Sequence, residues 1–302
     1  MATTRKILKV IKSKPTLEGA GVHLKRAFGF GETSLFDPFL LLDDFRGDSP
    51  EMYIKGFPWH PHRGIETITY VLRGNVAHGD SMGNHGVIDP GDVQWMTAGS
   101  GIIHQEMPKG DSEGKMYGFQ LWANLPKKDK MIDPNYQGVV DSEIPRVKLA
   151  DGTEVRVICG TYQGKTGPIR NVTIQPEYLD VSVPAHSVFT HELPVEHTLL
   201  AYVFEGSGVF CDNSDPFAYD KEGANYFDTE RKDELGNTSL ILFGPGDQMK
   251  VTTRANAVRF LLISGLPIRE PVAWYGPIVM NTEEDLKTAF QELGQDTFIK
   301  HR

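Results

Sequence analysis

Three short motifs occur twice in this chain in the same order, and this repetition limits its possible folds more than any other feature. The sequence TYVLRG at residues 69–74 returns as AYVFEG at 201–206, DPGD at 89–92 as GPGD at 244–247, and GFQLWANLP at 118–126 as RFLLISGLP at 259–267. A single match of this kind arises by chance, but three in one order indicate an internal duplication. The copies lie about 130 to 155 residues apart, which is enough for each to form a domain.

Both copies have the composition of β-structure. The chain contains 31 Gly and 19 Pro residues, and they separate short runs of β-branched and aromatic residues. Seven of these runs predict strands, at residues 67–72, 93–96, 117–123, 155–159, 199–204, 240–243 and 258–264. Many short strands with regular turns favour sandwiches or barrels over alternating strands and helices. We therefore expect an all-β fold of two barrels in tandem.

The polar run from Lys127 to Arg146 is the expected connection between the barrels. We accordingly assign residues 1–130 to an N-terminal barrel and residues 131–302 to a C-terminal barrel. The lysine-rich segment before residue 15 is expected to form a first strand of the N-terminal barrel.

Two further segments belong to the second copy. The acidic stretch from Cys211 to Thr238 is expected to form a solvated hairpin or loop. A short structural helix is predicted near the C-terminus, because Asn281 and Glu284 have the spacing of a capping box and apolar residues follow at helical intervals. Gly294 is the expected stop of this helix.

Composition excludes several classes of protein. With 31 basic and 40 acidic residues the formal charge is -9, which disfavours direct binding of nucleic acid through its phosphates. No apolar run has the length of a secretory signal or a membrane span. Only Cys159 and Cys211 are present, and we expect them to be buried thiols in a reducing compartment. The predicted location is therefore the cytoplasm, or also the nucleus in a eukaryote.

One cluster of residue types points to chemistry. His60 and His62 are separated by a single residue, as are His104 and Glu106. Because side chains i and i+2 of a strand share a face, each pair can direct two ligands at one point if the two strands lie close together. Three imidazoles and one carboxylate suit a divalent transition metal, with Fe, Mn, Co, Ni and Cu all acceptable. An isolated His-X-His pair is more often a pair of unrelated surface residues, but here both pairs adjoin the repeated turn motifs.

The remaining candidates are weaker. Glu66 has the parity of the first histidine pair, and we expect it to accept a hydrogen bond from a ligand histidine. His78 and His85 lie in a polar glycine-rich segment and are predicted to be exposed turn residues. The second copy has histidines at 186, 191 and 197, but their spacing does not provide a complete ligand set. We therefore expect one active and one degenerate half.

Several runs of this sequence resemble the pirin family, whose members are two-barrel proteins of the cupin superfamily. The runs are DPFLLLDDF at residues 37–45, FPWHPHRG at 57–64, GDVQWMTAG at 91–99, GIIHQEMP at 101–108 and GPIVMN at 276–281. The resemblance extends from about residue 5 to residue 293. Seven residues separate Glu66 from Gly74, where many cupins have six, and this departure is similar to that of pirins.

The resemblance implies a fold, a cofactor and two activities. The fold would be two antiparallel cupin β-barrels of the jelly-roll type with a short C-terminal helix. Iron would lie in the N-terminal barrel, bound by His60, His62, His104 and Glu106. Some pirins are similar to quercetin 2,3-dioxygenases, which open a flavonol ring with O₂ and release carbon monoxide. Other pirins regulate transcription factors or metabolic enzymes by contact.

From these points we expect an oxidoreductase of the quercetin 2,3-dioxygenase type, with Fe(II), O₂ and a small flavonol-like aromatic substrate. Glu106 is the expected catalytic base as well as a ligand. The predicted substrate pocket is lined by Phe57, Trp59, Met107 and Gln120, with core packing as the alternative for each. The alternative function is an iron-containing regulatory protein whose oxidation state controls binding to a transcription factor or metabolic enzyme. The sequence identifies neither the native metal, nor the substrate, nor the oligomeric state.

Overall fold

The computed structural model describes residues 2–212, 215–222 and 231–301 of the chain. It divides into two compact units, each assembled from two separate stretches of sequence. The histidine unit consists of residues 14–143 and 268–302, and the companion unit of residues 1–13 and 144–267. Among the described residues, no helix has both the length and the apolar character needed to cross a membrane.

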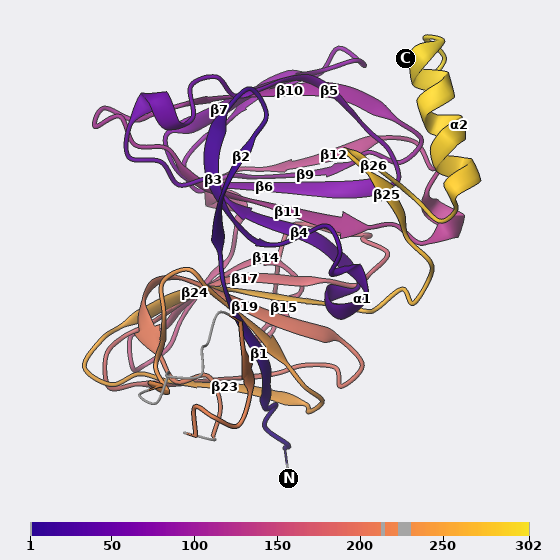
Figure 1. The fold of residues 1–302 in the computed structure, drawn as a ribbon. Helices are drawn as coiled ribbons and strands as arrows, with labels where there is room; N and C mark the ends of the chain where they lie inside the picture. Colours follow the sequence, from indigo (N-terminus) through magenta and orange to yellow (C-terminus); the bar gives the residue numbers. More distant parts are fainter. Residues whose placement is uncertain (1, 213–214, 223–230, 302) are drawn as a thin grey trace. The chain divides into compact units, whose positions relative to one another are not determined.

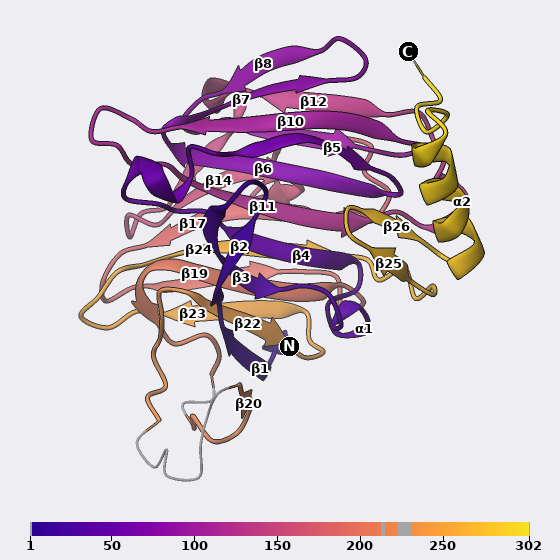
Figure 2. The ribbon, with the colours of Figure 1, turned by 45° about the horizontal axis from the view of Figure 1, so that its top comes forward.

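The histidine unit contains two antiparallel sheets, a C-terminal hairpin and two helices (Figures 1 and 2). One sheet has seven strands in the order β12-β9-β6-β11-β4-β3-β2, and the other has four in the order β5-β10-β7-β8. Its strands are β2 (Lys14–Glu18), β3 (Val22–Phe28), β4 (Phe39–Asp44), β5 (Phe57–His62), β6 (Ile65–Arg73), β7 (Asn75–Asp80), β8 (His85–Ile88), β9 (Val93–Thr97), β10 (Ile102–Lys109), β11 (Tyr117–Asn124), β12 (Asn135–Val139), β25 (Ala273–Tyr275) and β26 (Ile278–Met280). The α-helices are α1 (Thr33–Phe36) and α2 (Glu283–Gly294), and short 3₁₀ turns occupy Pro50–Met52, Lys127–Asp129 and Asp141–Glu143.

Strand β10 of this unit alternates buried and more accessible side chains. In β10, Ile102, His104 and Glu106 are buried, whereas Ile103 and Gln105 between them are only partly buried. This alternation is the period-2 pattern of a strand with one face toward a core. The inner face of β10 therefore carries polar as well as apolar side chains, and this arrangement is what brings the predicted ligands into the interior.

The companion unit is built on one large sheet, in the order β13-β14-β17-β24-β19-β22-β1-β20 with β21 beside β19. Its strands are β1 (Ile7–Lys12), β13 (Arg146–Lys148), β14 (Glu154–Cys159), β15 (Thr161–Tyr162), β16 (Lys165–Thr166), β17 (Glu177–Val183), β18 (Val188–Glu192), β19 (Thr198–Gly208), β20 (Asp220–Lys221), β21 (Leu235–Gly236), β22 (Ser239–Phe243), β23 (Gln248–Thr252) and β24 (Val258–Gly265). A continuous apolar core, which includes Val155, Leu179 and Phe260, fills it. Cys159 and Cys211 are both buried in this unit, and no disulfide joins them.

All seven strands predicted from the sequence are present, as β6, β9, β11, β14, β19, β22 and β24. Two of the three repeated motifs occupy equivalent positions in the two units. The first lies in β6 and β19 and the last in β11 and β24, and β6 pairs with β11 as β19 pairs with β24. The third match falls at different places in the two topologies. DPGD precedes β9, which pairs with β6, whereas GPGD follows β22, which pairs with β19.

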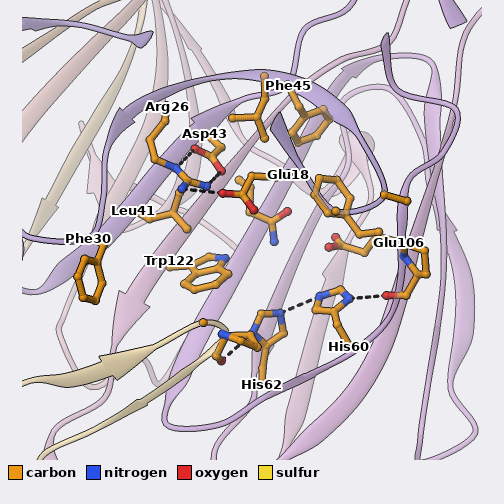
Figure 3. Close-up of a pocket in the computed structure, with 18 of the residues that line it drawn as sticks. Glu18, Arg26, Phe30, Leu41, Asp43, Phe45, His60, His62, Glu106 and Trp122 are labelled. Atoms are coloured by element: carbon orange, nitrogen blue, oxygen red, sulfur yellow. Dashed lines mark hydrogen bonds and ion pairs between the residues drawn. The ribbon is translucent and has the colours of Figure 1, made fainter. Parts of the chain in front are cut away.

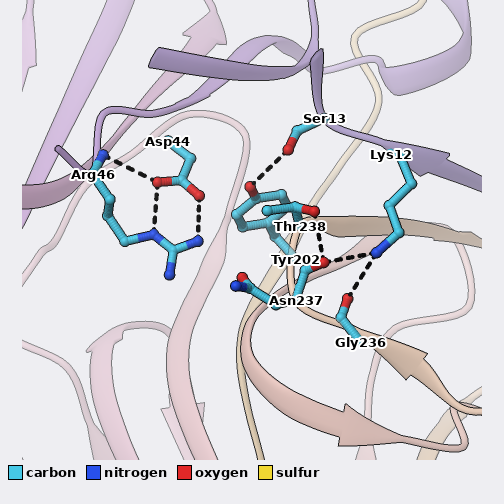
Figure 4. A network of polar contacts seen from close by, with 8 residues as sticks. All are labelled: Lys12, Ser13, Asp44, Arg46, Tyr202, Gly236, Asn237 and Thr238. Carbon is cyan, nitrogen blue, oxygen red and sulfur yellow. Dashed lines mark hydrogen bonds and ion pairs between the residues drawn. The ribbon is translucent and has the colours of Figure 1, made fainter. Parts of the chain in front are cut away.

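The units differ from the expected boundaries at both ends of the chain. The first strand, β1, pairs with β22 and so lies in the companion unit. Lys12 and Ser13 add side-chain contacts there, as Nζ of Lys12 donates to the carbonyl of Asn237 at 2.7 Å and the Ser13 hydroxyl lies 3.2 Å from that of Tyr202 (Figure 4). An isolated N-terminal strand has unsatisfied backbone groups, and the edge of the β22 sheet satisfies them.

The C-terminal helix is likewise in the histidine unit rather than with the second barrel. Its apolar side packs on the β25–β26 hairpin around Ile278, Leu286 and Ala289. The helix starts one residue later than predicted, with Thr282 as the N-cap accepting a hydrogen bond from the backbone N–H of Asp285, and it ends with Gly294 inside its last turn.

Two other connections also differ from expectation. The predicted linker contains a strand, β12, which extends the first sheet by pairing with β9. The predicted loop from Cys211 to Thr238 includes β20 and β21, and part of that prediction lies outside the described residues.

Candidate metal centre

Two neighbouring strands bring the predicted ligands together. Strands β5 and β10 are antiparallel, with His60 directly opposite His104 and His62 opposite Ile102. Opposed side chains on one face of such a pair have Cβ atoms about 5 Å apart. A bulge after His104 then shifts the register, so that Glu106 lies opposite Phe57. The i, i+2 spacing of the histidines therefore produces a cluster because β10 is the strand adjacent to β5.

The three histidines form a compact group. One ring nitrogen from each of His60, His62 and His104 lies within 4.8 Å of the others. The ring centroids are 4.4 to 5.0 Å apart. His62 and His104 are each only 1% exposed, whereas His60 is partly accessible at the cavity described below (Figure 3).

The hydrogen bonds of two rings fix where their lone pairs point. Nδ1 of His60 lies 2.8 Å from the carbonyl oxygen of Pro58, and Nδ1 of His62 lies 3.2 Å from that of Pro277. Because a carbonyl only accepts, both Nδ1 atoms carry the hydrogen, and both Nε2 atoms have lone pairs in the neutral rings. These two Nε2 atoms are 3.0 Å apart. Two lone pairs this close repel each other unless a cation lies between them.

A metal ion fits this arrangement better than an additional proton. Burial lowers the pKa of His60, and burial together with the neighbouring rings holds the pKa of His62 well below its usual value. The pKa of His104 is lowered in the same way, and both of its ring nitrogens are buried without a hydrogen-bond partner. Neutral imidazole is the form that binds metals. The three rings therefore have the neutral protonation state that metal binding requires, with nitrogen lone pairs available to bind a metal.

Glu106 lies in the same cavity but outside the three-histidine group. Its Oε1 accepts a hydrogen bond from the Thr69 hydroxyl at 3.0 Å. Burial raises the pKa of Glu106 to about 7, although hydrogen bonds from Thr69 and Gln120 act in the opposite direction. That Glu106 is the fourth metal ligand stays a prediction.

A cavity of about 620 Å³ opens onto the histidines. Three of the four predicted pocket residues line it, namely Phe57, Trp59 and Gln120. Met107 is not part of the lining, since the strand alternation that turns Glu106 inward turns its neighbour to the other side, near Gly56. The same alternation in the sequence would have excluded it.

Sequence reasoning missed several lining residues. Trp122 follows Gln120 by two positions in β11, so the period of a strand would have indicated it, and its ring centroid lies 5.0 Å from that of His62. Trp274 and Pro277 come from the C-terminal hairpin. Glu18, Arg26 and Asp43 are charged residues of β2, β3 and β4. Asp43 lies in the DPFLLLDDF run, but nothing in the local sequence indicates that these three residues share a cavity.

Known proteins are similar to this chain over nearly its whole length. The model of the Pirin family matches residues 21–123, and that of the pirin C-terminal cupin domain matches residues 178–299. A pirin-like protein of Caulobacter vibrioides is 42% identical over 295 residues, which cover 97% of this chain and 99% of that protein. The chain belongs to the pirin family.

Solved structures extend the comparison. A quercetin 2,3-dioxygenase from Acinetobacter baumannii matches with a TM-score of 0.83 and 30% identity, over 98% of this chain and 99% of that one. The bacterial pirin of Escherichia coli in complex with nickel(II) matches with a TM-score of 0.60 over 85% of this chain and 98% of that one, and at 19% identity it is similar in fold only. The chain described here accordingly has two cupin-type halves.

The remaining histidines and Glu66 have other surroundings in this pirin. Oε1 of Glu66 accepts from the Thr97 hydroxyl at 2.8 Å, so the structure gives this carboxylate a threonine partner where we expected a histidine. His85 is exposed as predicted, but His78 is half-buried and its Nε2 accepts from the Gln94 amide at 2.9 Å.

The companion unit contains a different histidine arrangement. His191 lies 2.9 Å from the Glu177 carboxylate, and His197 lies 3.4 Å from the Ser264 hydroxyl. Within the described ranges, the three-histidine cluster of the other unit is the one group of three potential ligands found. The expectation of one active and one degenerate half stays a prediction.

Proposed function

We propose that this chain is a metal-dependent dioxygenase that opens the ring of a flavonol-type substrate with O₂ and releases carbon monoxide. The observation that carries the proposal is the convergence of two histidine Nε2 lone pairs, 3.0 Å apart, at an aromatic-lined cavity. The similarity to the quercetin 2,3-dioxygenase of Acinetobacter baumannii supports the choice of reaction.

The ligands we propose are His60, His62, His104 and Glu106, with Fe(II) as the metal and Mn, Co, Ni or Cu as the alternatives. A bound divalent metal supplies Lewis acidity, which lowers the pKa of a coordinated hydroxyl and stabilises negative charge on oxygen. Softness and geometry allow each of these metals at a nitrogen and oxygen site, and the nickel complex of the Escherichia coli pirin is one example in a related fold.

The side chains around the cavity would bind and orient a planar aromatic molecule. Trp122 and Trp274 lie 6.1 Å apart between ring centroids, and both line the cavity beside Phe57. Aromatic walls remove a flat apolar ring from water and restrict its orientation. In the proposed reaction, Glu106 Oε accepts the proton of the substrate hydroxyl, and the Thr69 hydroxyl holds this carboxylate in place.

Oxygen consumption by anaerobically Fe(II)-loaded protein on addition of quercetin tests the proposal. We expect uptake of O₂ with release of carbon monoxide, both lost in the double variant His60→Ala/His104→Ala. The matched control is His85→Ala, because His85 is exposed in the β7–β8 hairpin and away from the cluster. If the metal-loaded wild-type protein consumes no O₂ with any flavonol, the proposed dioxygenase activity is wrong.

The exposure of the cavity entrance supports the second candidate, a regulatory protein that senses oxidation state. Trp59 is 55% exposed although it is adjacent to the proposed ligand His60. A change of metal charge beside an exposed aromatic side chain could alter the binding of a protein partner. The discriminating measurement is partner affinity with the metal in its reduced and oxidised forms, in the absence of flavonol.

A further inference from the structure

We propose that the cavity contains a second recognition site, formed by Glu18, Arg26 and Asp43, which accepts a hydrogen bond from a hydroxyl group at the end of the ligand remote from the metal. This inference rests on the proposed function, since it specifies which substrates that cavity takes. It predicts an elongated aromatic substrate that is chelating at one end and carries a hydrogen-bond donor such as a hydroxyl, and no anionic group, at the other.

The site is built into the strand register of the larger sheet. Arg26 of β3 lies opposite Asp43 of β4, Asp43 lies opposite Gln120 of β11, and Gln120 lies opposite Thr69 of β6. These four side chains form a polar row across the inner face of the sheet. The row ends next to Glu106, which accepts hydrogen bonds from Thr69 and Gln120. One row therefore joins the charged cluster to the predicted metal site.

The three charged residues are held in a fixed geometry. Arg26 donates to both carboxylate oxygens of Asp43, from Nε at 2.8 Å and from Nη2 at 2.7 Å, and its Nη1 lies 2.8 Å from Oε1 of Glu18 (Figure 3). The Asp43 side chain is 8% exposed, whereas that of Glu18 is 40% exposed. A planar guanidinium that bridges two carboxylates restricts both of them, so their remaining lone pairs point in defined directions.

The charges of the cluster select the kind of group it binds. Two carboxylates and one guanidinium give a net charge of about −1. Each guanidinium nitrogen already donates to a carboxylate, and the two carboxylates more than offset the positive charge that would attract an anion. Each carboxylate oxygen, in contrast, has capacity for a further hydrogen bond. The cluster therefore favours a donor such as a hydroxyl and disfavours a carboxylate.

The cavity wall between the charged cluster and the histidines indicates the chemical character of the middle of the ligand. In Figure 3 the indole of Trp122 separates the Arg26–Asp43 pair from His62. In the sheet, Trp122 lies opposite Leu41, which also lines the cavity, and Phe45 contributes to the lining near Asp43. Apolar and aromatic walls between a cationic metal end and an acidic end fit a flat aromatic molecule with polar groups at both ends.

Binding to the Zn²⁺-loaded full-length protein tests the inference without turnover. The probes are 3-hydroxyflavone, its 4′-hydroxy analogue and its 4′-carboxy analogue, all with the same chelating group, and chelation is followed by the shift in their absorption. A single 4′-hydroxyl cannot itself chelate the metal. We expect the 4′-hydroxy compound to bind about tenfold more tightly than the parent, as a hydrogen bond to a charged group would give. The 4′-carboxy compound should bind more weakly than the parent.

The variant Glu18→Leu removes one acceptor at a half-exposed position and leaves Arg26 paired with Asp43. It should reduce the preference for the 4′-hydroxyl, measured as the ratio of the dissociation constants of the parent and the 4′-hydroxy compound in the same variant, to about twofold or less. Glu284→Leu on α2, an exposed glutamate outside the cavity, is the matched control and should keep the full preference. If the cluster only ties β2, β3 and β4 together, Glu18→Leu would instead lower the melting temperature and leave the preference for the 4′-hydroxyl intact.

The outcomes separate this inference from the proposed function. Chelation of all probes with equal affinity for the parent and the 4′-hydroxy compound would overturn the second recognition site and leave the metal-chelating cavity standing. A preference that survives in Glu18→Leu would also overturn it. No chelation of any probe by the Zn²⁺-loaded protein would overturn the proposed function, and this inference with it.

Discussion

The carbonyl oxygen of Pro277 lies 3.2 Å from Nδ1 of His62, although the two residues are 215 positions apart in the sequence. This contact fixes the tautomer of His62 and turns its Nε2 toward His60. The oxygen belongs to the turn between β25 and β26. In the sequence, this hairpin follows residues 144–267 of the companion unit. The C-terminal hairpin is therefore part of the candidate metal site.

Gly64 provides a test of this dependence. Its φ is +77°, and a Cβ there would lie 2.0 Å from the carbonyl oxygen of Val279 in β26. We expect Gly64→Ala to lower the free energy of unfolding by about 3 kcal/mol, through backbone strain and overpacking. Displacement of the hairpin should also weaken Zn²⁺ binding about tenfold, as loss of an outer partner of a metal ligand does.

The control for this substitution is Gly83→Ala. Gly83 has a similar φ of +87°, but a Cβ there meets nothing within 4 Å. It should therefore lower the free energy of unfolding by about 1 kcal/mol and leave Zn²⁺ affinity unchanged. Denaturant unfolding and competition with a chromophoric chelator measure the two quantities. Equal Zn²⁺ affinities in the two variants would show that the hairpin does not position His62.

The sequence was sufficient to predict what depends on local spacing. The His60/His62 and His104/Glu106 pairs were predicted because two-residue spacing within a strand places side chains on one face. The strands themselves were recognisable because β-branched runs alternate with turn residues. Trp122 could have been found by the same rule from its spacing to Gln120.

The parts that were missed depend on which strands become neighbours. Pro277 reaches His62 only because the C-terminal segment returns to the histidine unit, and no local pattern encodes that return. The pairing of Arg26 with Asp43 likewise follows from the register of β3 against β4. The same reason explains why the N-terminal strand was assigned to the wrong barrel, since its partner β22 lies more than 200 residues away.

Arg63 is predicted to hold the C-terminal segment in the histidine unit. Its guanidinium is buried, donates to the carbonyls of Ser100 at 2.7 Å and Phe298 at 2.8 Å, and forms an ion pair of 2.8 Å with Glu292 of α2. We expect Arg63→Met to lower the free energy of unfolding by about 3 kcal/mol, because buried carbonyls and a carboxylate lose their donor. Limited proteolysis should then cleave the segment after residue 267.

A surface arginine gives the comparison for Arg63. Arg73 contacts Asp111 and Glu113, and its side chain is 35% exposed. Arg73→Met should lower the free energy of unfolding by less than about 1 kcal/mol and should not expose the C-terminal segment to protease. If both variants resist proteolysis equally, Arg63 does not anchor this segment.

Metal binding should stabilise the folded protein through the histidine cluster. The 3.0 Å approach of two Nε2 lone pairs is unfavourable without a cation and favourable with one. At free Zn²⁺ about 100 times its dissociation constant, we expect the free energy of unfolding to rise by about 2.7 kcal/mol. His104→Ala should abolish most of this increase, and His85→Ala should retain it. Removal of the metal by a chelator should reverse the increase in the wild type, and an unchanged melting temperature on loading would contradict the site.

The pH dependence of stability should contain a contribution from Lys130. This lysine is buried, and its Nζ donates to the carbonyl of Gly64 at 2.8 Å and to Oδ1 of Asn124 at 2.6 Å. Burial lowers the pKa of Lys130 from 10.5 to about 7, although the charge of Glu270 acts in the opposite direction. Between about pH 7 and pH 10.5 the unfolded chain therefore binds more protons at this residue than the folded chain.

Stability contributed by Lys130 should accordingly rise with pH across that window and be constant below it. We expect the difference in free energy of unfolding between the wild type and Lys130→Met to increase by up to about 1.4 kcal/mol per pH unit, in favour of the wild type. The variant loses both hydrogen bonds but also the cost of burying a charge, so it should compare best with the wild type at pH 7 and worst near pH 10. Lys128→Met, at an exposed neighbouring position, is the control for the replacement of a lysine by methionine in this segment. Denaturant titrations at half-unit steps measure both differences, and a flat curve for Lys130→Met would mean that Lys130 is solvated and charged in the folded protein.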